Sequence, residues 1–469
     1  MTSTSHTIRI GNAAGFLGDQ MTVPSRLLAT GELDYLTLEY LAELTLAILA
    51  RQRRRDPALG YARDFVEVLG DLIPELQSGR TTRIVTNAGG LNTRGCIQAA
   101  ARLLASAGLG RLRLGIVEGD DLSGRIDQLR QSGHTLAHLD SGEPFSLPAN
   151  EVVCASAYLG AEPIARALAA GADIVVTGRV ADASLVVGPA MHEFSWGWDD
   201  WPSLAAATLA GHLIECGAQV TGGYLDRWRD IDLANVGYPI AELTAGGSVT
   251  ITKPDGSGGV VDRETVAAQL LYEIGDPAVY LTPDVVLDLS EVEIRDQGDG
   301  RVHLAGAGGR PAPDDYKVSL VYEDGFATTG ELLVWGEDCT ERARAAAAII
   351  HERLTAQGAR PARWHVETLG DGTAAGVAAT HHDPNEVVLR VSAHDPSREV
   401  VERFAREIAP LITSGPAGLA GYASGRPKVR SMFAYWPTLI AKSCIEPAVT
   451  VKSADEWASV LSPNAEVDA

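Results

Sequence analysis

The chain has 469 residues, of which 45% are hydrophobic and 21% charged, a composition typical of a globular protein with two or three domains. Acidic residues outnumber basic ones by 61 to 39, and the net charge of −22 argues against binding to nucleic acid or to an anionic membrane. The start of the sequence is polar, no long apolar run follows, and the five cysteines form no CxxC pair. We therefore expect a cytoplasmic protein that uses neither disulfides nor a membrane span.

The first 200 residues alternate short apolar runs with longer amphipathic stretches. This order predicts parallel strands joined by crossover helices, and so an α/β fold with a mainly parallel sheet. Helices are expected at 36–51, 95–109 and 163–170. The expected strands, each followed by a polar or glycine-rich loop, are 8–13, 83–90, 113–121, 151–157 and 172–179.

The pattern changes after about residue 245. Residues 245–340 alternate with a period of two around Asp-Gly and Gly turns, which predicts a mixed or antiparallel β extension. A helix follows at 341–357, and residues 358–361 are expected to be a linker. The predicted division is therefore an α/β core domain at 1–357, a small α+β domain at 362–454 and a disordered tail at 455–469.

Three of the loops that follow predicted strands carry chemically useful side chains. Ligands of open parallel sheets bind beyond the carboxyl ends of the strands, so these loops are expected to share one rim. They are Thr86-Asn87-Ala88-Gly89-Gly90, Glu118-Gly119-Asp120-Asp121, and the segment from Thr177 to Ser184 with the sequence TGRVADAS. The N-terminal segment from Gly11-Asn12 to Gly18-Asp19 is a fourth polar loop of this kind.

Each loop has a functional and a purely structural interpretation. The amides of Gly89 and Gly90, together with Asn87, could stabilise an oxyanion, or the loop could be an ordinary strand-to-helix turn. Glu118, Asp120 and Asp121 could provide acid–base chemistry or hold a divalent metal, or could form a solvated acidic loop.

In the third loop, Arg179 and Asp182 are expected to form an ion pair that directs the guanidinium at a carboxylate or phosphate. The alternative is that Asp182 or Ser184 only caps the next helix.

The segment 211–224 is the densest cluster of reactive residue types. His212 and Cys216 would share one face of a helix, so a nucleophilic pair is conceivable, but a small buried cysteine at a helix end is the favoured interpretation. Tyr224, which ends the segment, is retained as a candidate substrate-binding residue. No GxGxxG, P-loop, HExxH or GxSxG motif occurs, which argues against dinucleotide oxidoreductases, P-loop enzymes, zincins and α/β-hydrolases.

Several long blocks, in this order along the chain, resemble the acyclic terpene utilisation (AtuA-type) family. The C-terminal ITSGPAGLAGY (412–422) resembles the ferredoxin-like domain appended in that family. The blocks are IGNAAGFLGD (10–19), LTLEYLAELTLAILAR (36–51), DPALGYARDF (56–65), IVTNAGGLN (84–92), VVTGRVADASLVVGPAMHEFSW (175–196), AGHLIECGAQVTGGY (210–224), GYPIAEL (237–243) and LLYEIGDPAVYLTPDVV (270–286).

The resemblance implies an enzyme that acts on a branched acyl-CoA or another acyl thioester or carboxylate, by lyase or hydratase chemistry. On this hypothesis Asn87, Gly89 and Gly90 stabilise an enolate, and Arg179 holds a substrate carboxylate together with Ser184 and Tyr224. Glu118, Asp120 or Asp182 is then the base.

We expect a small anionic substrate, a homo-oligomer and no nucleic-acid or membrane partner; a divalent metal is a further option. The alternatives are a non-catalytic ligand-binding subunit of an acyl-CoA-processing complex and a family member recruited to natural-product biosynthesis.

Overall fold

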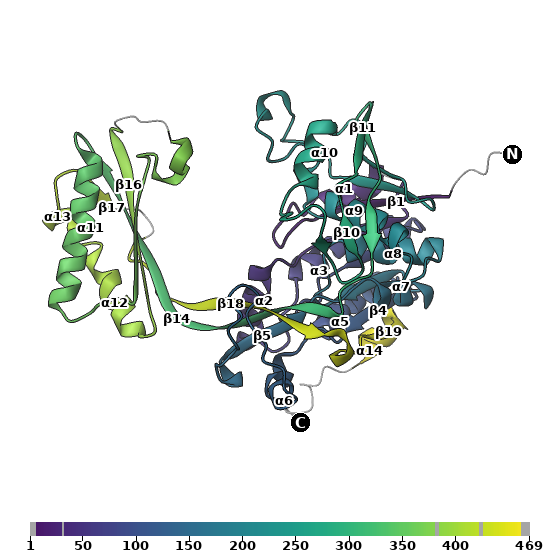
Figure 1. The fold of residues 1–469 in the computed structure, drawn as a ribbon, viewed down its shortest axis with the longest axis horizontal. Coiled ribbons are helices and arrows are strands. Elements are labelled where there is room, and N and C mark those ends of the chain that lie inside the picture. Colours follow the sequence, from purple (N-terminus) through teal and green to yellow (C-terminus); the bar gives the residue numbers. More distant parts are fainter. Residues whose placement is uncertain (1–5, 31, 380–383, 422–424, 461–469) are drawn as a thin grey trace. The chain divides into compact units, whose positions relative to one another are not determined.

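The computed structural model describes residues 6–30, 32–379, 384–421 and 425–460. The chain folds into two compact units. Unit 1 comprises Met1–Val321 and Tyr435–Ala469, and unit 2 comprises Tyr322–Ala434. Unit 2 is therefore inserted into unit 1: the chain leaves unit 1 along β14 (Asp315–Trp335) and returns along β18 (Arg430–Ala441), as Figure 1 shows.

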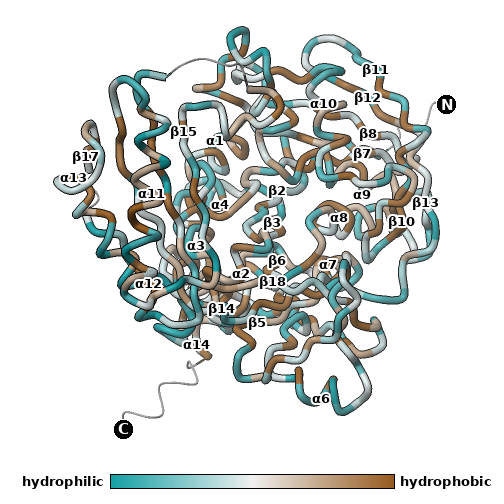
Figure 2. The backbone as a smooth tube through the Cα atoms, turned by 60° about the vertical axis from the view of Figure 1, so that its left-hand side comes forward, coloured by the Kyte–Doolittle hydropathy of each residue, from teal (hydrophilic) through white to brown (hydrophobic). Residues whose placement is uncertain are grey.

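Unit 1 is built on a mixed sheet, which has ten strands within the described residues. Its centre is parallel, because four- to six-residue strands that are buried on both faces are joined through helices. Figure 2 shows the hydrophobic residues of these central strands as brown stretches of the tube. The parallel strands, in sheet order, are β1 (Thr7–Asn12), β2 (Tyr35–Leu38), β3 (Arg83–Thr86), β6 (Ile174–Thr177) and β4 (Arg113–Glu118).

Antiparallel strands extend this parallel core at both edges, so the expectation of a mainly parallel sheet is corrected to a mixed sheet. Beyond β4 lies β19 (Ala448–Ser453), and beyond β1 lies a meander of alternating strands. The meander consists of β7 (Ile240–Thr244), β8 (Val249–Thr252), β12 (Arg301–Ala305) and β11 (Glu293–Gly298). A separate antiparallel sheet is formed by β13 (Gly308–Arg310), β10 (Val286–Asp288) and β9 (Tyr280–Leu281).

Helices cover the parallel core. One set shares a single hydrophobic cluster with the central strands, and consists of α1 (Val23–Thr30), α3 (Arg63–Asp71), α5 (Thr93–Ser106) and α14 (Ala454–Ser459). A second set packs in sequence, α7 on α8 and α8 on α9, and contacts β1, β2, β4, β6, β7 and β8. Its members are α7 (Glu162–Ala169), α8 (Ser184–Phe194) and α9 (Trp201–Ile214).

The remaining helices of unit 1 lie along the connections between these elements. They are α2 (Glu43–Arg55), α4 (Ile73–Gln77), α6 (Ile126–Gln131) and α10 (Arg263–Leu270). In the described part of the chain, no helix combines the length and the apolar character needed to cross a lipid bilayer.

Two expectations for the parallel region are wrong in detail. The stretch 36–51 is not one helix: its beginning forms β2, between β1 and β3, and only Glu43 starts α2. The run 151–157 does form a strand, β5 (Val152–Ala157), but this strand pairs with β14 outside the large sheet. In both cases tertiary pairing, which local periodicity does not encode, decides the outcome.

Unit 2 is an antiparallel sheet with helices on one face. Leu389 and Val391 of the central strand alternate with exposed-face residues and pack with Ile350 and Phe404 of the helices into a second hydrophobic cluster. In Figure 1, α11 and α12 lie side by side along this sheet. Its strands are β15 (Arg363–Leu369), β16 (Glu386–Asp395), β14 and β17 (Leu419–Gly421), and its helices are α11 (Cys339–Ala356), α12 (Arg398–Glu407) and α13 (Leu411–Ser414).

These boundaries differ from the expected division at 357–362. Helix α11 packs on β15 and β16, so it lies in unit 2, and β19 and α14 return to unit 1. The expected tail also begins too early, because α14 extends to Ser459 and its Trp457 is 1% exposed. Residues 461–469 of that tail lie outside the described residues. The ferredoxin-like assignment of the α+β part stays a prediction.

Candidate functional site

The carboxyl ends of the parallel strands bring several predicted residues together. Strand β2 runs into Glu39, β3 into Asn87, β4 into Asp120, and β6 into Arg179 and Asp182. Because parallel strands end at one edge of a sheet, these side chains converge there. The loops are in direct contact, as a Cβ built on Gly89 would lie 2.5 Å from the carbonyl oxygen of Thr177.

Arg179 is the centre of this cluster. Its side chain is 2% exposed, and its Nη1 lies 2.9 Å from Asp182 Oδ1 and 3.8 Å from Glu39 Oε1. Nη1 also donates a hydrogen bond to the carbonyl oxygen of Leu41, and Cζ lies 4.0 Å from the centre of the Tyr158 ring. A buried cation needs such compensation, and Nη1 organises the two carboxylates around it, whereas no described group accepts a hydrogen bond from the buried Nε.

Glu39 is the buried carboxyl of the pair and was missed by the sequence analysis. Its Oε1 accepts hydrogen bonds from Leu41 N, at 2.7 Å, and from Asn87 Nδ2, whereas no described group bonds to Oε2. Burial, and then the charge of Asp182, raise the pKa of Glu39 well above its ordinary value, against the opposing effect of Arg179. Glu39 is therefore a candidate neutral acid with one unpartnered oxygen.

Asn87 serves Glu39 in this structure. It is completely buried, its Nδ2 donates to Glu39, and its Oδ1 accepts from the backbone N–H of Tyr40 at 2.8 Å. Both ends of the amide are therefore occupied. Asn87 positions the Glu39 carboxyl, and the backbone N–H of the nearby Gly90 donates to the carbonyl oxygen of Asn87 in a turn.

Asp182 differs from Glu39 because it reaches solvent. Its side chain is 34% exposed although it pairs with the buried Arg179. Burial raises the pKa of Asp182, Arg179 lowers it, and the negative charges of Glu43 and Glu273 raise it further. A carboxylate with these opposing influences and access to solvent has the features of a general base.

A solvent-exposed rim adjoins this cluster. Tyr158 Oη donates to Glu43 Oε1 at 3.0 Å, and Lys317 Nζ donates to the same oxygen at 3.3 Å. Lys317 Nζ also lies 4.9 Å from the centre of the Tyr158 ring, and the Glu43 and Lys317 side chains are 44% and 42% exposed. The rim thus places an accessible ammonium group close to Arg179 and its carboxylates.

His212 and Glu215 form a second acid–base pair, at the end of α9. His212 Nδ1 lies 3.3 Å from Glu215 Oε1, and His212 Nε2 lies 3.2 Å from the carbonyl oxygen of Leu270. A carbonyl oxygen only accepts, so Nε2 carries a hydrogen and Nδ1 faces the carboxyl. Burial raises the pKa of Glu215 to about 7, with further contributions from the charges of Asp182 and Glu273.

No described group bonds to Oε2 of Glu215. The neighbouring Cys216 is a free cysteine, and burial raises the pKa of its thiol to about 12, which disfavours the nucleophilic thiolate. Of the two interpretations of segment 211–224, this environment favours the structural cysteine.

Two of the other predicted acids have structural partners. Glu118 accepts hydrogen bonds from Arg94 at 2.7 and 2.8 Å. Asp120 is 4% exposed, and its Oδ2 accepts from the backbone N–H of Arg179 at 2.8 Å. Asp120 thus holds the loop that carries Arg179, and burial raises its pKa to about 7.

Ser184 and Tyr224 lie outside the cluster of contacts around Arg179. Ser184 Oγ is buried and donates to Asp284 Oδ2 at 2.5 Å, while Asp284 Oδ1 accepts from Ala161 N at 2.7 Å. Tyr224 has a φ of 64° and is 92% exposed. Among the described residues, no three Asp, Glu, His or Cys side chains converge closely enough to hold a metal ion.

Five residues of the site were not among the predicted site residues: Glu39, Glu43, Tyr158, Lys317 and Glu215. A signal existed for Glu39, because it directly follows the buried run YLTL at 35–38, but the assignment of 36–51 to one helix concealed it. Comparison with individual curated proteins gives no match. The model of the family described as acyclic terpene utilisation family protein AtuA matches residues 8–451, and the chain therefore belongs to this family.

Proposed function

We propose that this chain is an enzyme that carries out acid–base chemistry on a carboxylate or acyl-thioester substrate, with Asp182 as the general base. The single observation that carries the proposal is the contrast around Arg179. Two carboxyls share one buried guanidinium, Glu39 is enclosed, and Asp182 reaches solvent. Membership of a family implicated in acyclic terpene utilisation supports a branched acyl group in the substrate.

The proposed reaction is a reversible elimination of water, the chemistry of a hydratase or lyase. Asp182 takes the proton from the carbon next to the acyl carbonyl, and the electron pair moves onto the carbonyl oxygen to form an enolate. The ammonium of Lys317 offsets the charge on that oxygen. When the enolate collapses, the bond from the β-carbon to its hydroxyl breaks, and the departing oxygen takes a proton from Glu215 and leaves as water.

The other predicted residues act as positioning residues in this proposal. Arg179 opposes the rise in the pKa of Asp182 that burial causes, Asn87 orients Glu39, and Asp120 fixes the backbone of the Arg179 loop. The binding of a substrate carboxylate by Arg179 stays a prediction; the Nε of Arg179 is buried and has no hydrogen-bond partner among the described groups.

Proton exchange tests this proposal without requiring the complete reaction. The protein is incubated in D₂O with 3-hydroxy-3-methylglutaryl-CoA as a branched hydroxyacyl probe, and mass spectrometry follows deuterium at the α-carbon. Asp182→Asn should slow incorporation by about 10²- to 10⁴-fold, the usual contribution of a positioned base. Asp140→Asn, at a side chain that is 88% exposed, is the control and should exchange at the wild-type rate.

A folded Asp182→Asn protein that exchanges as fast as the wild type would disprove the role of Asp182. If the probe raises the melting temperature of the wild-type protein but takes up no deuterium, the chain binds acyl-CoA without catalysis, which is the ligand-binding alternative.

A further inference from the structure

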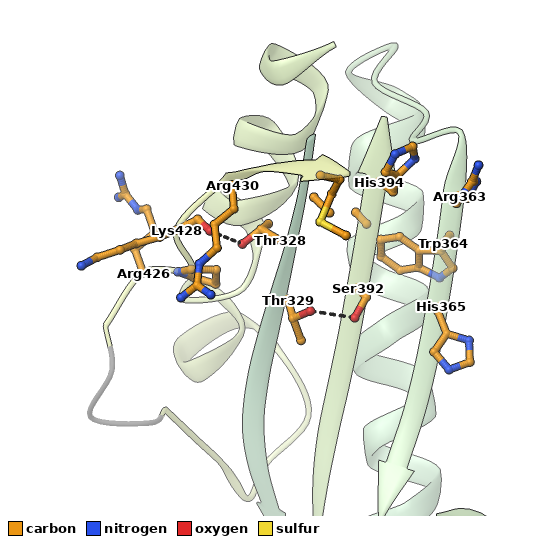
Figure 3. Close-up of a pocket in the computed structure, with 14 residues that line it drawn as sticks. Thr328, Thr329, Arg363, Trp364, His365, Ser392, His394, Arg426, Lys428 and Arg430 are labelled. Carbon is orange, nitrogen blue, oxygen red and sulfur yellow. Dashed lines mark hydrogen bonds between the residues drawn. The ribbon is translucent and has the colours of Figure 1, made fainter. Parts of the chain in front are cut away.

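Unit 2 contains a groove that the acid–base site does not use. Its volume is about 750 Å³, and all the residues that line it belong to unit 2. Within the described part of the chain, the lining contains no acidic side chain. Its basic and imidazole side chains are Arg363, His365, His394, Arg426, Lys428 and Arg430 (Figure 3).

The floor of the groove is the sheet face that the helices leave open. Thr329, Ser392 and His365 are directly opposite one another on β14, β16 and β15, so they share this face. Ser392 alternates with Val391 and Ala393, which belong to the helix-covered cluster on the other face. The hydroxyls of Thr329 and Ser392 lie 2.8 Å apart, and Figure 3 shows them pointing toward each other.

The wall of the groove is the segment that leads into β18. Arg426, Lys428 and Arg430 alternate within five residues, and all three are exposed. The hydroxyl of Thr328 donates to the carbonyl oxygen of Lys428 at 3.0 Å, which fixes this segment to β14. This contact involves a backbone carbonyl, so it holds the segment beside the floor without occupying the charged groups of the three side chains.

The charges of the groove are only partly balanced by the protein. Asp324 lies 3.4 Å from Arg363 and 3.3 Å from His394, and Glu367 lies 3.6 Å from His365. In contrast, no described acidic group lies within ion-pair distance of the three wall cations. Although the chain has a net charge of −22, the three wall cations create a local positive potential. Their like charges repel one another, and a bound anion would relieve this repulsion.

We propose that this groove binds a phosphorylated small molecule that carries at least two phosphate groups. Guanidinium groups bind phosphate oxygens through paired hydrogen bonds, and the hydroxyls of Thr329 and Ser392 supply further donors. The volume is typical of small-molecule sites and leaves room for more than one inorganic phosphate. Two phosphates also carry enough charge to neutralise all three wall cations.

Calorimetric titration of the full chain tests the proposal with inorganic triphosphate and ADP as probes. We expect saturable binding with one site per chain, which weakens as salt is raised from about 50 mM because the wall cations are exposed. Arg430→Ala and Lys428→Ala should each weaken binding by about tenfold or more, the effect of one lost charge-assisted hydrogen bond. The melting temperature confirms that each variant is folded.

The control is Arg403→Ala, on α12. Arg403 pairs with Glu399 at 2.6 Å and does not line the groove, so its removal should leave the affinity unchanged. Equal losses in all three variants, or binding that does not saturate, would overturn the proposal. Citrate that binds as tightly as triphosphate would show a general anion site and contradict the preference for phosphate. A single-stranded oligonucleotide that binds when triphosphate and ADP do not would also contradict the proposal, because the ligand would then be a nucleic acid. Each of these readouts is independent of Asp182 and its reaction.

Discussion

The buried charge of Arg179 is compensated by neighbouring groups, and two of these groups are acids of the proposed site. Arg179 is surrounded by Glu39, Asp182, a backbone carbonyl and the Tyr158 ring, so its desolvation is compensated on several sides. The compensation also perturbs its partners: burial raises the pKa of both Glu39 and Asp182 while Arg179 opposes the rise. One guanidinium therefore opposes the effect of burial on the pKa of two acids that differ in their access to solvent.

Asp120 makes a pH-dependent contribution to stability whose sign is defined. Because burial raises its pKa to about 7 in the folded protein, the folded state retains a proton that the unfolded chain releases near pH 4. The stabilisation is fully present below about pH 4 and is lost as pH rises toward 7. Asp120→Asn resembles the protonated acid at every pH. Between pH 4 and pH 7 the unfolding free energy of the wild type should therefore decrease by a few kcal/mol more than that of Asp120→Asn.

Denaturant unfolding at several pH values between 4 and 8 measures this difference. Other buried acids, including Asp284, change wild type and variant alike, so the comparison isolates Asp120. Asp140→Asn, at an exposed carboxylate, should follow the wild-type curve. Parallel curves for wild type and Asp120→Asn would refute the assignment.

For these residues, the position of a loop directly after a predicted strand identified members of the site better than the type of residue did. Asn87, Asp120, Arg179 and Asp182 were found because a polar loop follows an apolar run. Their roles could not be deduced in this way, because the sequence does not show that Glu39 occupies the Asn87 amide. Tyr224 was selected from a block of reactive residue types, and nothing in that pattern indicated its 92% exposure.

At the scale of elements, the site depends on close contact between loops. Gly89 lies against the end of β6, where a Cβ would come within 2.5 Å of Thr177 O and 3.0 Å of Thr93 Cα. Both obstacles are backbone atoms, which cannot move aside as a flexible side chain can. The glycine is thus required for approach of the β3 and β6 loops.

Gly89→Ala should therefore destabilise the protein by about 1–3 kcal/mol, the cost of overpacking a filled region. Gly70→Ala in α3 is a matched control, because the nearest atom to its added Cβ is 3.8 Å away and alanine favours helix. Chemical denaturation of both variants measures the effect. A Gly89→Ala protein as stable as Gly70→Ala would show that the loops separate without cost.

Elements with strong local patterns were predicted well, and those defined by their partners were not. The helix Cys339–Ala356, expected at 341–357, follows a clear period of three to four residues. Strand β2 has only four residues, all buried, and therefore shows no alternation that distinguishes it from a helix. The pairing of β5 with β14 joins residues far apart in the chain, which no local pattern records.

For the molecule as a whole, the end of the chain belongs to the core of unit 1. Strand β19 pairs with β4 along six residues, and α14 packs on α5. Trp457 is 1% exposed, and its Nε1 donates to Leu114 O at 2.9 Å. The polar sequence around Trp457 suggested a frayed tail, but one buried indole is enough to dock the helix.

Trp457→Ala should lower the unfolding free energy by about 3–5 kcal/mol, because it leaves a large cavity and an unpaired carbonyl. Trp198, which is 69% exposed, provides the control: Trp198→Ala should change stability by no more than about 0.5 kcal/mol. Unfolding followed by circular dichroism compares the two. Similar stabilities would show that α14 does not anchor the sheet.

The insertion of unit 2 between two strands has a consequence for how the gene can be divided. Where the chain leaves and rejoins unit 1, β14 pairs with β18, and the hydroxyls of Ser319 and Tyr435 lie 3.3 Å apart. The two cut ends would therefore already be neighbours, and a few residues could bridge them with little loop-closure entropy. Unit 2 is in this sense a detachable cassette, which evolution or an engineer could delete or exchange while both termini and the ten-stranded sheet stay in place.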